Sequence, residues 1–468
     1  MITKIKVYTF SRGGIHFTDP SAPSRDTWVT AFLPALSIIP LVHHTGSRVL
    51  PVVSVGDSVK EGMLVGRGQD PGSANIHATV PGKVVRTVSW KMIEGHTNDA
   101  LVIRMEGAFD KLGRREEVFP WRDFSPEKLQ TLVSEYGVVS MEGSGLPVSE
   151  LLASFQAMRG SRSLVVRCVF DDPWLAADYV LCRERLKAIV EGSVIAARAS
   201  LAKRIIYAIS QRERELEGLF LAEASAYDIP ASAVIVSSRY PQQNRRELEI
   251  VLRIYAKRAG IDLGEILLLG PATLAAIHDA VKLHRPILDR YVAVGGTAVK
   301  KPQVMKVRIG TRIRDIFEEC GGFTGTPGRI ATGSPFLGRV VQDLDEPVIK
   351  TSYAVFAFLK KRIGKVRNCI GCGECRAVCP VGLDPEELFK AAGISVTAES
   401  FTGSPGTVSD AAMTGSGPVM ASYCHGCGSC ELVCPSRLPL STVIANFAWG
   451  TLSQNTRGTV PQKVQGRL

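Results

Sequence analysis

The C-terminal part of the chain contains the same cysteine pattern twice. One copy reads C-I-G-C-G-E-C-R-A-V-C-P from Cys369, and the other reads C-H-G-C-G-S-C-E-L-V-C-P from Cys424. Eight of the 11 cysteines lie in these two copies. A disulfide framework spreads its cysteines along a chain, whereas a metal site bunches them. The pattern therefore predicts a segment that folds around metal in a reducing compartment.

The spacing C-x2-C-x2-C-x3-C-P predicts two [4Fe-4S] clusters, because its fourth cysteine ligates the other cluster of a pair. We expect one cluster on Cys369, Cys372, Cys375 and Cys434, and the second on Cys424, Cys427, Cys430 and Cys379. The alternative is a pair of structural zinc sites. Zinc ribbons typically pair two C-x2-C knuckles and require neither a third cysteine at this spacing nor the following proline.

Three cysteines lie outside the repeats, namely Cys168, Cys182 and Cys320. They are most simply buried small apolar side chains. His425 lies inside the second repeat, but four thiolates already complete that ligand set. We therefore expect this imidazole beside the cluster rather than on it.

Length and charge limit the remaining possibilities. A chain of 468 residues is too long for one hydrophobic core, so we expect three or four domains. The net charge of +11 comes from scattered basic residues without interleaved aromatic residues, which argues against nucleic acid and leaves an anionic membrane or partner surface. The apolar stretch 30–43 is too short to span a membrane, and the first residues do not resemble a signal peptide.

The N-terminal region predicts short strands joined by tight turns. Its segments V-G-D-S-V-K-E-G-M-L, from Val55, and H-A-T-V-P-G-K-V, from His77, resemble the two halves of a biotinyl/lipoyl-type barrel-sandwich domain. No M-K-M occurs in the chain, so the domain is expected to be a scaffold. We assign it residues 1–122.

The next region, residues 123–286, predicts an α/β domain with a largely parallel sheet. A helix is expected after the N-cap Ser125, ending at Gly137. Apolar strands at 163–170, 232–237 and 265–270 then alternate with helical stretches, the longest from about residue 175 to 221. Strand and helix alternation is typical of parallel α/β sheets.

Residues 290–322 give two strands and a short helix, and resemble a soluble-ligand-binding β-grasp (SLBB) domain, assigned to 287–345. Residues 346–468 then form a helical two-cluster ferredoxin module. The expected fold class is therefore multidomain α/β plus β. It comprises a barrel-sandwich domain, an α/β domain similar to the complex I flavoprotein, an SLBB domain and the ferredoxin module.

These modules in this order, opened by R-G-G-I-H at Arg12, resemble the RnfC family of Rnf-type ion-translocating electron transport complexes. The resemblance implies a peripheral subunit on the cytoplasmic face of the inner membrane. It implies electron transfer between membrane subunits and a soluble carrier, which is ferredoxin, flavodoxin or NADH. It also implies that the α/β domain carries FMN and NADH, while the coupling ion and the direction of electron flow stay open.

The flavin and nucleotide region departs from that family. The family loop G-x-G-G-A-G-F-P corresponds here to G-V-V-S-M-E-G-S-G-L-P, and N-G-A-E-C-E-P-Y corresponds to R-C-V-F-D-D-P-W. Tyr-Pro-Gln is retained without its following glycine, and L-L-L-G-P-A-T lacks the asparagine expected near Gly270. The flavin or nucleotide candidates that remain are Gly143, Gly145, Asp172 and Tyr240. A flavin must split a hydride into single electrons for such clusters, so we expect loss or severe weakening of NADH binding.

Two other functions stay open. A soluble NADH-flavin iron-sulfur oxidoreductase, similar to the cobalamin-reductase relatives, predicts bound flavin and NADH-dependent dye reduction. An assembly subunit with structural clusters predicts clusters that do not cycle. No residue stands out as a catalytic acid, base or nucleophile, so enzymatic activity of the isolated chain is left undecided.

Overall fold

The computed structural model describes residues 6–16, 18–42, 49–91, 97–109, 117–142, 144–334, 338–360, 366–392 and 417–445. The chain forms two compact units, each built from segments far apart in the sequence. The first unit comprises Met1–Val7, Thr18–Val236 and Arg253–Lys360, and the second comprises Tyr8–Phe17, Ser237–Leu252 and Lys361–Leu468. Among the helices of the described residues, none has the length and apolar composition of a membrane span.

Two small antiparallel sheets at the start of the first unit enclose one apolar core. One has the order β2-β8-β7-β4 and the other β3-β5-β6. Their strands are β2 (Leu36–Pro40), β3 (Val49–Pro51), β4 (Ser58–Val59), β5 (Leu64–Gly68), β6 (Ile76–His77), β7 (Gly82–Lys91) and β8 (Thr97–Met105). Ile39, Val65 and Ile103 lie at the centre of this core, each at most 1% exposed. The arrangement is that of a barrel sandwich.

The second part of the first unit is a four-stranded, all-parallel sheet with the order β11-β10-β9-β12. The strands are β9 (Arg162–Cys168), β10 (Arg204–Ser210), β11 (Ala231–Val236) and β12 (Glu265–Leu269). The expected helix from about 175 to 221 is wrong, because β10 interrupts it. The apolar run of β10 has charged segments on both sides, which hid its strand character. Since β12 lies on the opposite side of β9 from β10, the direction of winding changes between β9 and β12.

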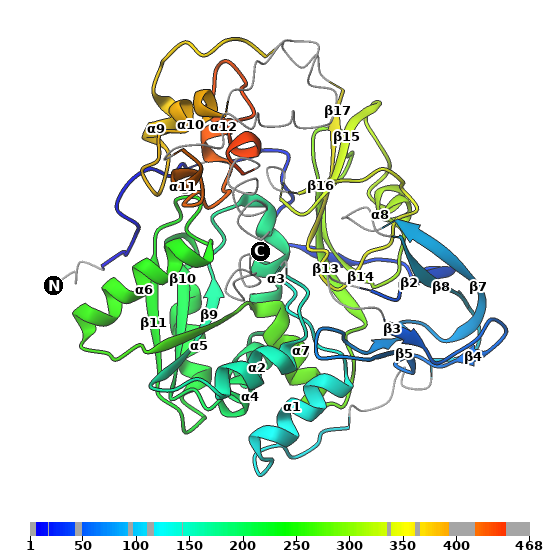
Figure 1. The fold of residues 1–468 in the computed structure, drawn as a ribbon. Coiled ribbons are helices and arrows are strands. Elements are labelled where there is room, and N and C mark those ends of the chain that lie inside the picture. Colours follow the sequence, from blue (N-terminus) through cyan, green and yellow to red (C-terminus); the bar gives the residue numbers. More distant parts are fainter. Residues whose placement is uncertain are drawn as a thin grey trace, which may run out of the picture. The chain divides into compact units, whose positions relative to one another are not determined.

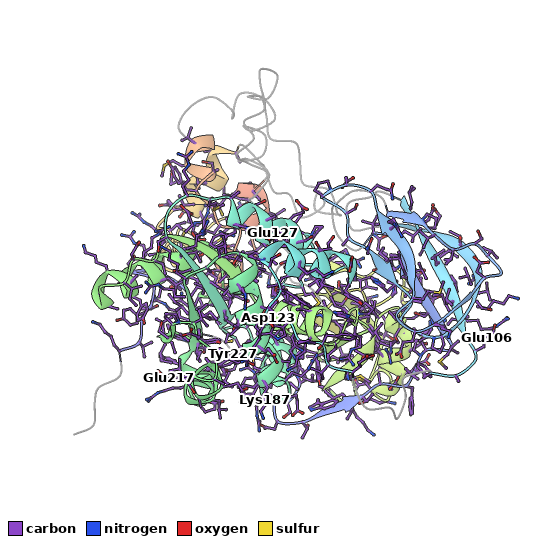
Figure 2. All side chains as sticks on the ribbon, turned by 90° about the horizontal axis from the view of Figure 1, so that it is seen from below. Glu106, Asp123, Glu127, Lys187, Glu217 and Tyr227 are labelled. Atoms are coloured by element: carbon purple, nitrogen blue, oxygen red, sulfur yellow. The ribbon has the colours of Figure 1, made fainter. Side chains whose placement is uncertain are left out.

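Helices surround this sheet, and Figure 1 shows β9, β10 and β11 beside one another with α5 alongside. They are α1 (Pro126–Glu135), α2 (Val148–Gln156), η1 (Pro173–Leu175), α3 (Ala176–Glu184), α4 (Leu186–Ala199), η2 (Gln211–Glu213), α5 (Glu215–Ala224), α6 (Arg245–Ala259) and α7 (Pro271–Lys282). The predicted start of α1 is confirmed, since Ser125 accepts a hydrogen bond from the Lys128 N–H. Glu127, labelled in Figure 2, places an acid in its first turn.

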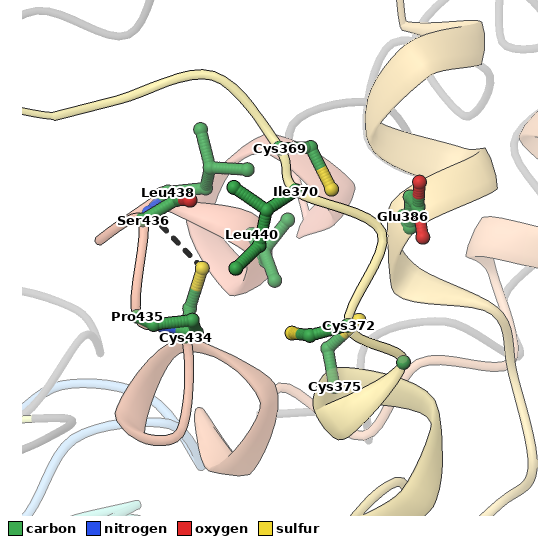
Figure 3. Close-up of a pocket in the computed structure, with 11 residues that line it drawn as sticks. Cys369, Ile370, Cys372, Cys375, Glu386, Cys434, Pro435, Ser436, Leu438 and Leu440 are labelled. Carbon is green, nitrogen blue, oxygen red and sulfur yellow. Dashed lines mark hydrogen bonds between the residues drawn. The ribbon is translucent and has the colours of Figure 1, made fainter.

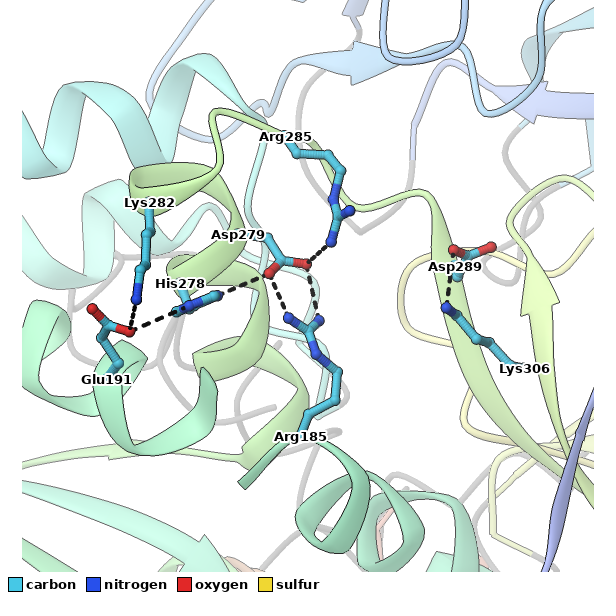
Figure 4. Close-up of polar contacts among 8 residues, drawn as sticks. All are labelled: Arg185, Glu191, His278, Asp279, Lys282, Arg285, Asp289 and Lys306. Atoms are coloured by element: carbon cyan, nitrogen blue, oxygen red, sulfur yellow. Dashed lines mark hydrogen bonds and ion pairs between the residues drawn. The ribbon is translucent and has the colours of Figure 1, made fainter. Parts of the chain in front are cut away.

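A buried ionic network joins α7 to the junction of α3 and α4 (Figure 4). Asp279 accepts hydrogen bonds from Arg185 Nη1 and Nη2 at 2.9 and 2.6 Å, and from Arg285 Nη2 at 3.0 Å. His278 Nδ1 lies 2.9 Å from the same carboxylate. Burial alone would raise the pKa of Asp279, but the hydrogen bonds from His278 and Arg185 outweigh it and hold the pKa well below its usual range.

Glu191 on α4 makes the second half of this network. It accepts hydrogen bonds from Trp121 Nε1 at 2.8 Å and from Lys282 Nζ at 2.5 Å, and His278 Nε2 lies 3.4 Å away. Burial opposes its ionisation, yet these partners lower the pKa of Glu191 to about 2. Burial likewise opposes protonation of His278, but its two carboxylate neighbours raise the pKa of this imidazole above its ordinary value. The network therefore fixes α7 against α4.

A six-stranded mixed sheet completes the first unit, with the order β1-β14-β13-β17-β15-β16. Its strands are β1 (Trp28–Thr30), β13 (Asp289–Gly295), β14 (Gln303–Arg308), β15 (Pro327–Thr332), β16 (Arg339–Val340) and β17 (Ala354–Leu359), and α8 (Ile313–Glu319) packs on it. The strands β1 and β17 lie outside the predicted SLBB range 287–345 but belong to this sheet. A small β-grasp module thus gains strands from both sides in the sequence.

The second unit is mainly helical. It contains α9 (Glu374–Ala377), α10 (Pro385–Ala391), α11 (Gly417–Ala421) and α12 (Ser429–Leu432). The predicted N-cap of α10 is confirmed, because Asp384 Oδ1 accepts from the Glu387 N–H at 3.4 Å. Leu388, Phe389 and Leu440 form its apolar core together with several of the repeat cysteines.

Candidate iron-sulfur centres

The two cysteine repeats fold into matching turns. Gly371 and Gly426, which precede the second cysteine of each repeat, have φ values of +67° and +64°. Gly373 and Gly428 begin α9 and α12 with the same φ of +74°. Such φ values favour glycine, which explains why both repeats read C-x-G-C-G. The sequence repeat is therefore a backbone repeat, with three thiols on each turn.

Backbone N–H groups donate to the sulfur atoms in the same way in both repeats. The first cysteine of each repeat accepts from the glycine two residues later, and the fourth accepts from the leucine four residues later. These bonds join Gly371 to Cys369 at 3.4 Å, Gly426 to Cys424 at 3.4 Å, Leu383 to Cys379 at 3.3 Å and Leu438 to Cys434 at 3.4 Å. Hydrogen bonds to ligand sulfurs help to set the potential of an iron-sulfur cluster.

One cavity brings thiols of the two repeats together, and Figure 3 shows them around it. Cys369, Cys372 and Cys375 come from the first repeat, and Cys434 faces them from the second. We call these four residues the first cluster site. Apolar side chains, among them Leu438 and Leu440, complete the lining. The donor set is four thiols in an apolar surrounding, which fits an iron-sulfur cluster.

The remaining thiols, Cys424, Cys427, Cys430 and Cys379, make up the second cluster site. Burial raises the pKa of the Cys427 thiol to about 11, so metal binding must supply the charge that makes it a thiolate. Within the described ranges, no group of three or more His, Cys, Asp or Glu side chains is placed to hold a single metal ion.

An N-terminal segment, residues 8–16, covers the fourth ligand of the second site, and we call it the strap. The Gly14 N–H donates to the Val378 carbonyl at 2.8 Å. A Cβ on Gly13 would lie 2.4 Å from the Cys379 carbonyl oxygen. Gly13 and Gly14 also have φ values of +64° and +76°. The sequence identified R-G-G-I-H only as a family feature, and its role in covering Cys379 was missed.

Residues 237–252 contact the loop of the second site. The Tyr240 hydroxyl donates to the Cys427 carbonyl at 2.7 Å, and Tyr240 is buried. The His425 imidazole forms a hydrogen bond with Glu247, whose side chain is also buried. Tyr240 was predicted as a flavin or nucleotide candidate, and the structure places it against a thiol loop. No local signal in the sequence links it to Cys427.

The two sites differ in exposure. Cys369 and Cys372 of the first site are exposed, and Ile370 between them is 70% exposed. Cys427 and Cys430 of the second site are buried. The first site therefore opens to solvent, while the second is enclosed by the strap and residues 237–252.

The other flavin or nucleotide candidates are held by different parts of the chain. Gly143 lies outside the described residues. Gly145 has a φ of +64°, and its N–H donates to the Ser140 carbonyl. Asp172 accepts from the Trp174 N–H at 2.9 Å and from Ser334 Oγ at 3.2 Å. Burial raises the pKa of Asp172 to about 6.

Family models match four successive parts of the chain. They are described as RnfC Barrel sandwich hybrid domain over residues 9–108, Nuo51 FMN-binding domain over 133–253, SLBB domain over 291–343, and 4Fe-4S dicluster domain over 368–438. The predicted fold class is thereby confirmed, as are the two [4Fe-4S] clusters. A dicluster module on this framework defines an iron-sulfur electron-transfer protein.

Similar proteins make the assignment more specific. The RnfC-type subunit of the ion-translocating oxidoreductase complex of Rhodobacter capsulatus is 31% identical over 81% of this chain and 74% of its own length. The corresponding subunit of the proton-translocating ferredoxin:NAD(+) oxidoreductase complex of Clostridium ljungdahlii is 29% identical over 81% and 83%. That of the Na(+)-translocating complex of Acetobacterium woodii is 27% identical over 75% and 80%. The chain belongs to the RnfC family of ion-translocating oxidoreductase complexes.

Proposed function

We propose that the chain is the peripheral electron-transfer subunit of a membrane-bound ion-translocating oxidoreductase complex. Its partners are the membrane subunits of that complex and a soluble electron carrier, and its location is the cytoplasmic face of the inner membrane. The names of the relatives, each a subunit of such a complex, support this proposal. The domain boundaries after residues 122, 286 and 345 are part of the same proposal.

The observation that carries the proposal is the cavity that joins the two repeats. Three thiols of one repeat and one of the other line it, as crosswise sharing of ligands requires. Bound at the two sites, [4Fe-4S] clusters supply one-electron transfer. The eight thiols hold them, and the N–H groups of Gly371 and Gly426 stabilise negative charge on the sulfurs.

The difference in exposure gives the two sites different tasks. We place the contact with the soluble carrier at the first site, because Cys369 and Cys372 reach the surface and Ile370 offers an apolar contact beside them. Electron exchange between proteins needs a short distance, which only an exposed site provides to a diffusing partner. The enclosed second site then faces the remaining subunits.

Anaerobic purification of the full chain tests the proposal. Iron and sulfide analysis should give about eight irons per chain, the content of two cubane clusters. Electron paramagnetic resonance should show two signals after addition of a reduced ferredoxin. Zinc in place of iron would reject the clusters, and clusters that no carrier reduces would favour an assembly role. Bleaching by NADH alone, with bound flavin, would favour the soluble oxidoreductase.

A further inference from the structure

The parallel sheet of the first unit has one place where a ligand is expected. In open α/β sheets, ligands bind at the carboxyl ends of the strands where the winding changes direction, which here is between β9 and β12. The helix that follows β12 is α7, and a helix N-terminus attracts the phosphate of a bound nucleotide. The free N–H groups at the start of α7 are therefore the groups that a flavin phosphate would need.

A carboxylate of the chain itself already occupies this helix end. Glu142 accepts hydrogen bonds from the Thr273 N–H at 3.1 Å and from Thr273 Oγ1 at 2.6 Å. The Met141 N–H donates to the same hydroxyl at 2.9 Å. Both oxygens of the carboxylate are therefore engaged at the first turn of α7. A fixed negative charge at this position takes the donors and repels a second anion.

The residue before α7 is matched to this arrangement. A Cβ built on Gly270 would lie 2.4 Å from both Cγ and Oε1 of Glu142. Any side chain at position 270 would thus displace Glu142. Aligned on the family loop G-x-G-G-A-G-F-P, Glu142 stands at a glycine, and the family asparagine is expected near Gly270. The two departures compensate each other, which a merely decayed site would not require.

The rest of this edge is also filled by side chains. After β9, Phe170 is 2% exposed and Trp174 is fully buried. The Trp174 ring lies edge-on to Phe356 of β17, with centroids 4.1 Å apart. After β10, Glu213 is held by Arg25 Nη1 at 2.5 Å, and its side chain is 4% exposed. Aromatic rings and an ion pair thus cover the ends of β9 and β10.

We infer that the carboxyl edge of this sheet binds neither FMN nor NADH, because Glu142 is a built-in anion in the place of the ligand phosphate. The residues present do not fit the flavin that the matched domain description names. The α/β domain is a scaffold. Resting on the proposed function, it follows that electrons reach the thiol sites only from protein carriers.

The first test measures flavin on the anaerobically purified full chain. Acid extraction should release no flavin, and equilibrium dialysis with FMN should show no saturable binding. One FMN per chain, either copurified or bound in dialysis, would overturn the inference. Iron content is measured on the same sample, so that loss of the clusters counts against the proposed function and flavin binding counts against this inference.

A second test examines Glu142 itself through the thermal stability of the first unit. Glu142→Ala should lower the unfolding temperature by roughly 2–4 °C, the value of about one helix-end charge interaction. Added inorganic phosphate should recover part of that loss in the variant and leave the unmodified chain unchanged. The matched control is Glu150→Ala, an exposed acid in the first turn of α2 without a capping bond. Equal unfolding temperatures for both variants would overturn the assignment of Glu142.

Discussion

Replacing Asp279 by alanine should destabilise the first unit without removing the clusters. The carboxylate binds two guanidinium groups and an imidazole, and its side chain is only 11% exposed. Removing one member of a buried ionic network costs about 3–5 kcal/mol, because the remaining charges lose their partner. Arg185 and Arg285 keep 29% and 33% of their side-chain exposure, so the expected cost is near the lower value, about 3 kcal/mol.

Urea unfolding, followed by circular dichroism and by native-state hydrogen exchange of the α7 amides, measures this cost. The exchange experiment is needed because a chain of several domains does not unfold in one step. The control is Glu217→Ala (Figure 2), which breaks a 3.7 Å pair with Arg214 at the surface and should cost less than about 0.5 kcal/mol. If Asp279→Ala costs no more than this control, the argument from the buried network is refuted.

Three further predictions concern the cluster sites and the same network. Cys434→Ala should lose the first cluster and keep the second, while Cys379→Ala should do the reverse, each leaving about four irons per chain; loss of the opposite cluster would contradict crosswise ligation. Tyr240→Phe removes a hydrogen bond to the Cys427 carbonyl and should shift the potential of the second cluster alone, measured by redox titration, with Tyr227→Phe as the unaffected control. The raised pKa of His278 means that its stabilising charge is fully present below about pH 6.5 and is lost as pH rises through the folded-state value, so the stability difference between the chain and His278→Asn should be larger at low pH than at high pH.

Features that depend on neighbours in the sequence were predictable. The starts of α1 and α10 follow from Ser125 and Asp384, because an N-cap acts within three residues of itself. The turns of the cysteine repeats follow from their glycines for the same reason. The strand β10 was missed because charged helical segments flank a short apolar run, and such a run has no periodicity that separates strand from helix.

Features that depend on distant residues were not predictable. The contact of Tyr240 with Cys427 and the cover of Gly13 over Cys379 join parts of the chain that no local pattern relates. The sequence showed that the family loop had changed at Glu142 and that an asparagine was missing near Gly270. Only the structure shows that these two changes occupy the same space.

The position of the strap has a consequence for the order of biosynthesis. The strap leaves the ribosome long before its partner, the Val378 carbonyl, has been made. Closing so long a loop is costly in entropy before other contacts form. The second site therefore stays open on the Cys379 side through most of translation, and iron and sulfide can be delivered there until the glycines of the strap settle over it as a late step of maturation.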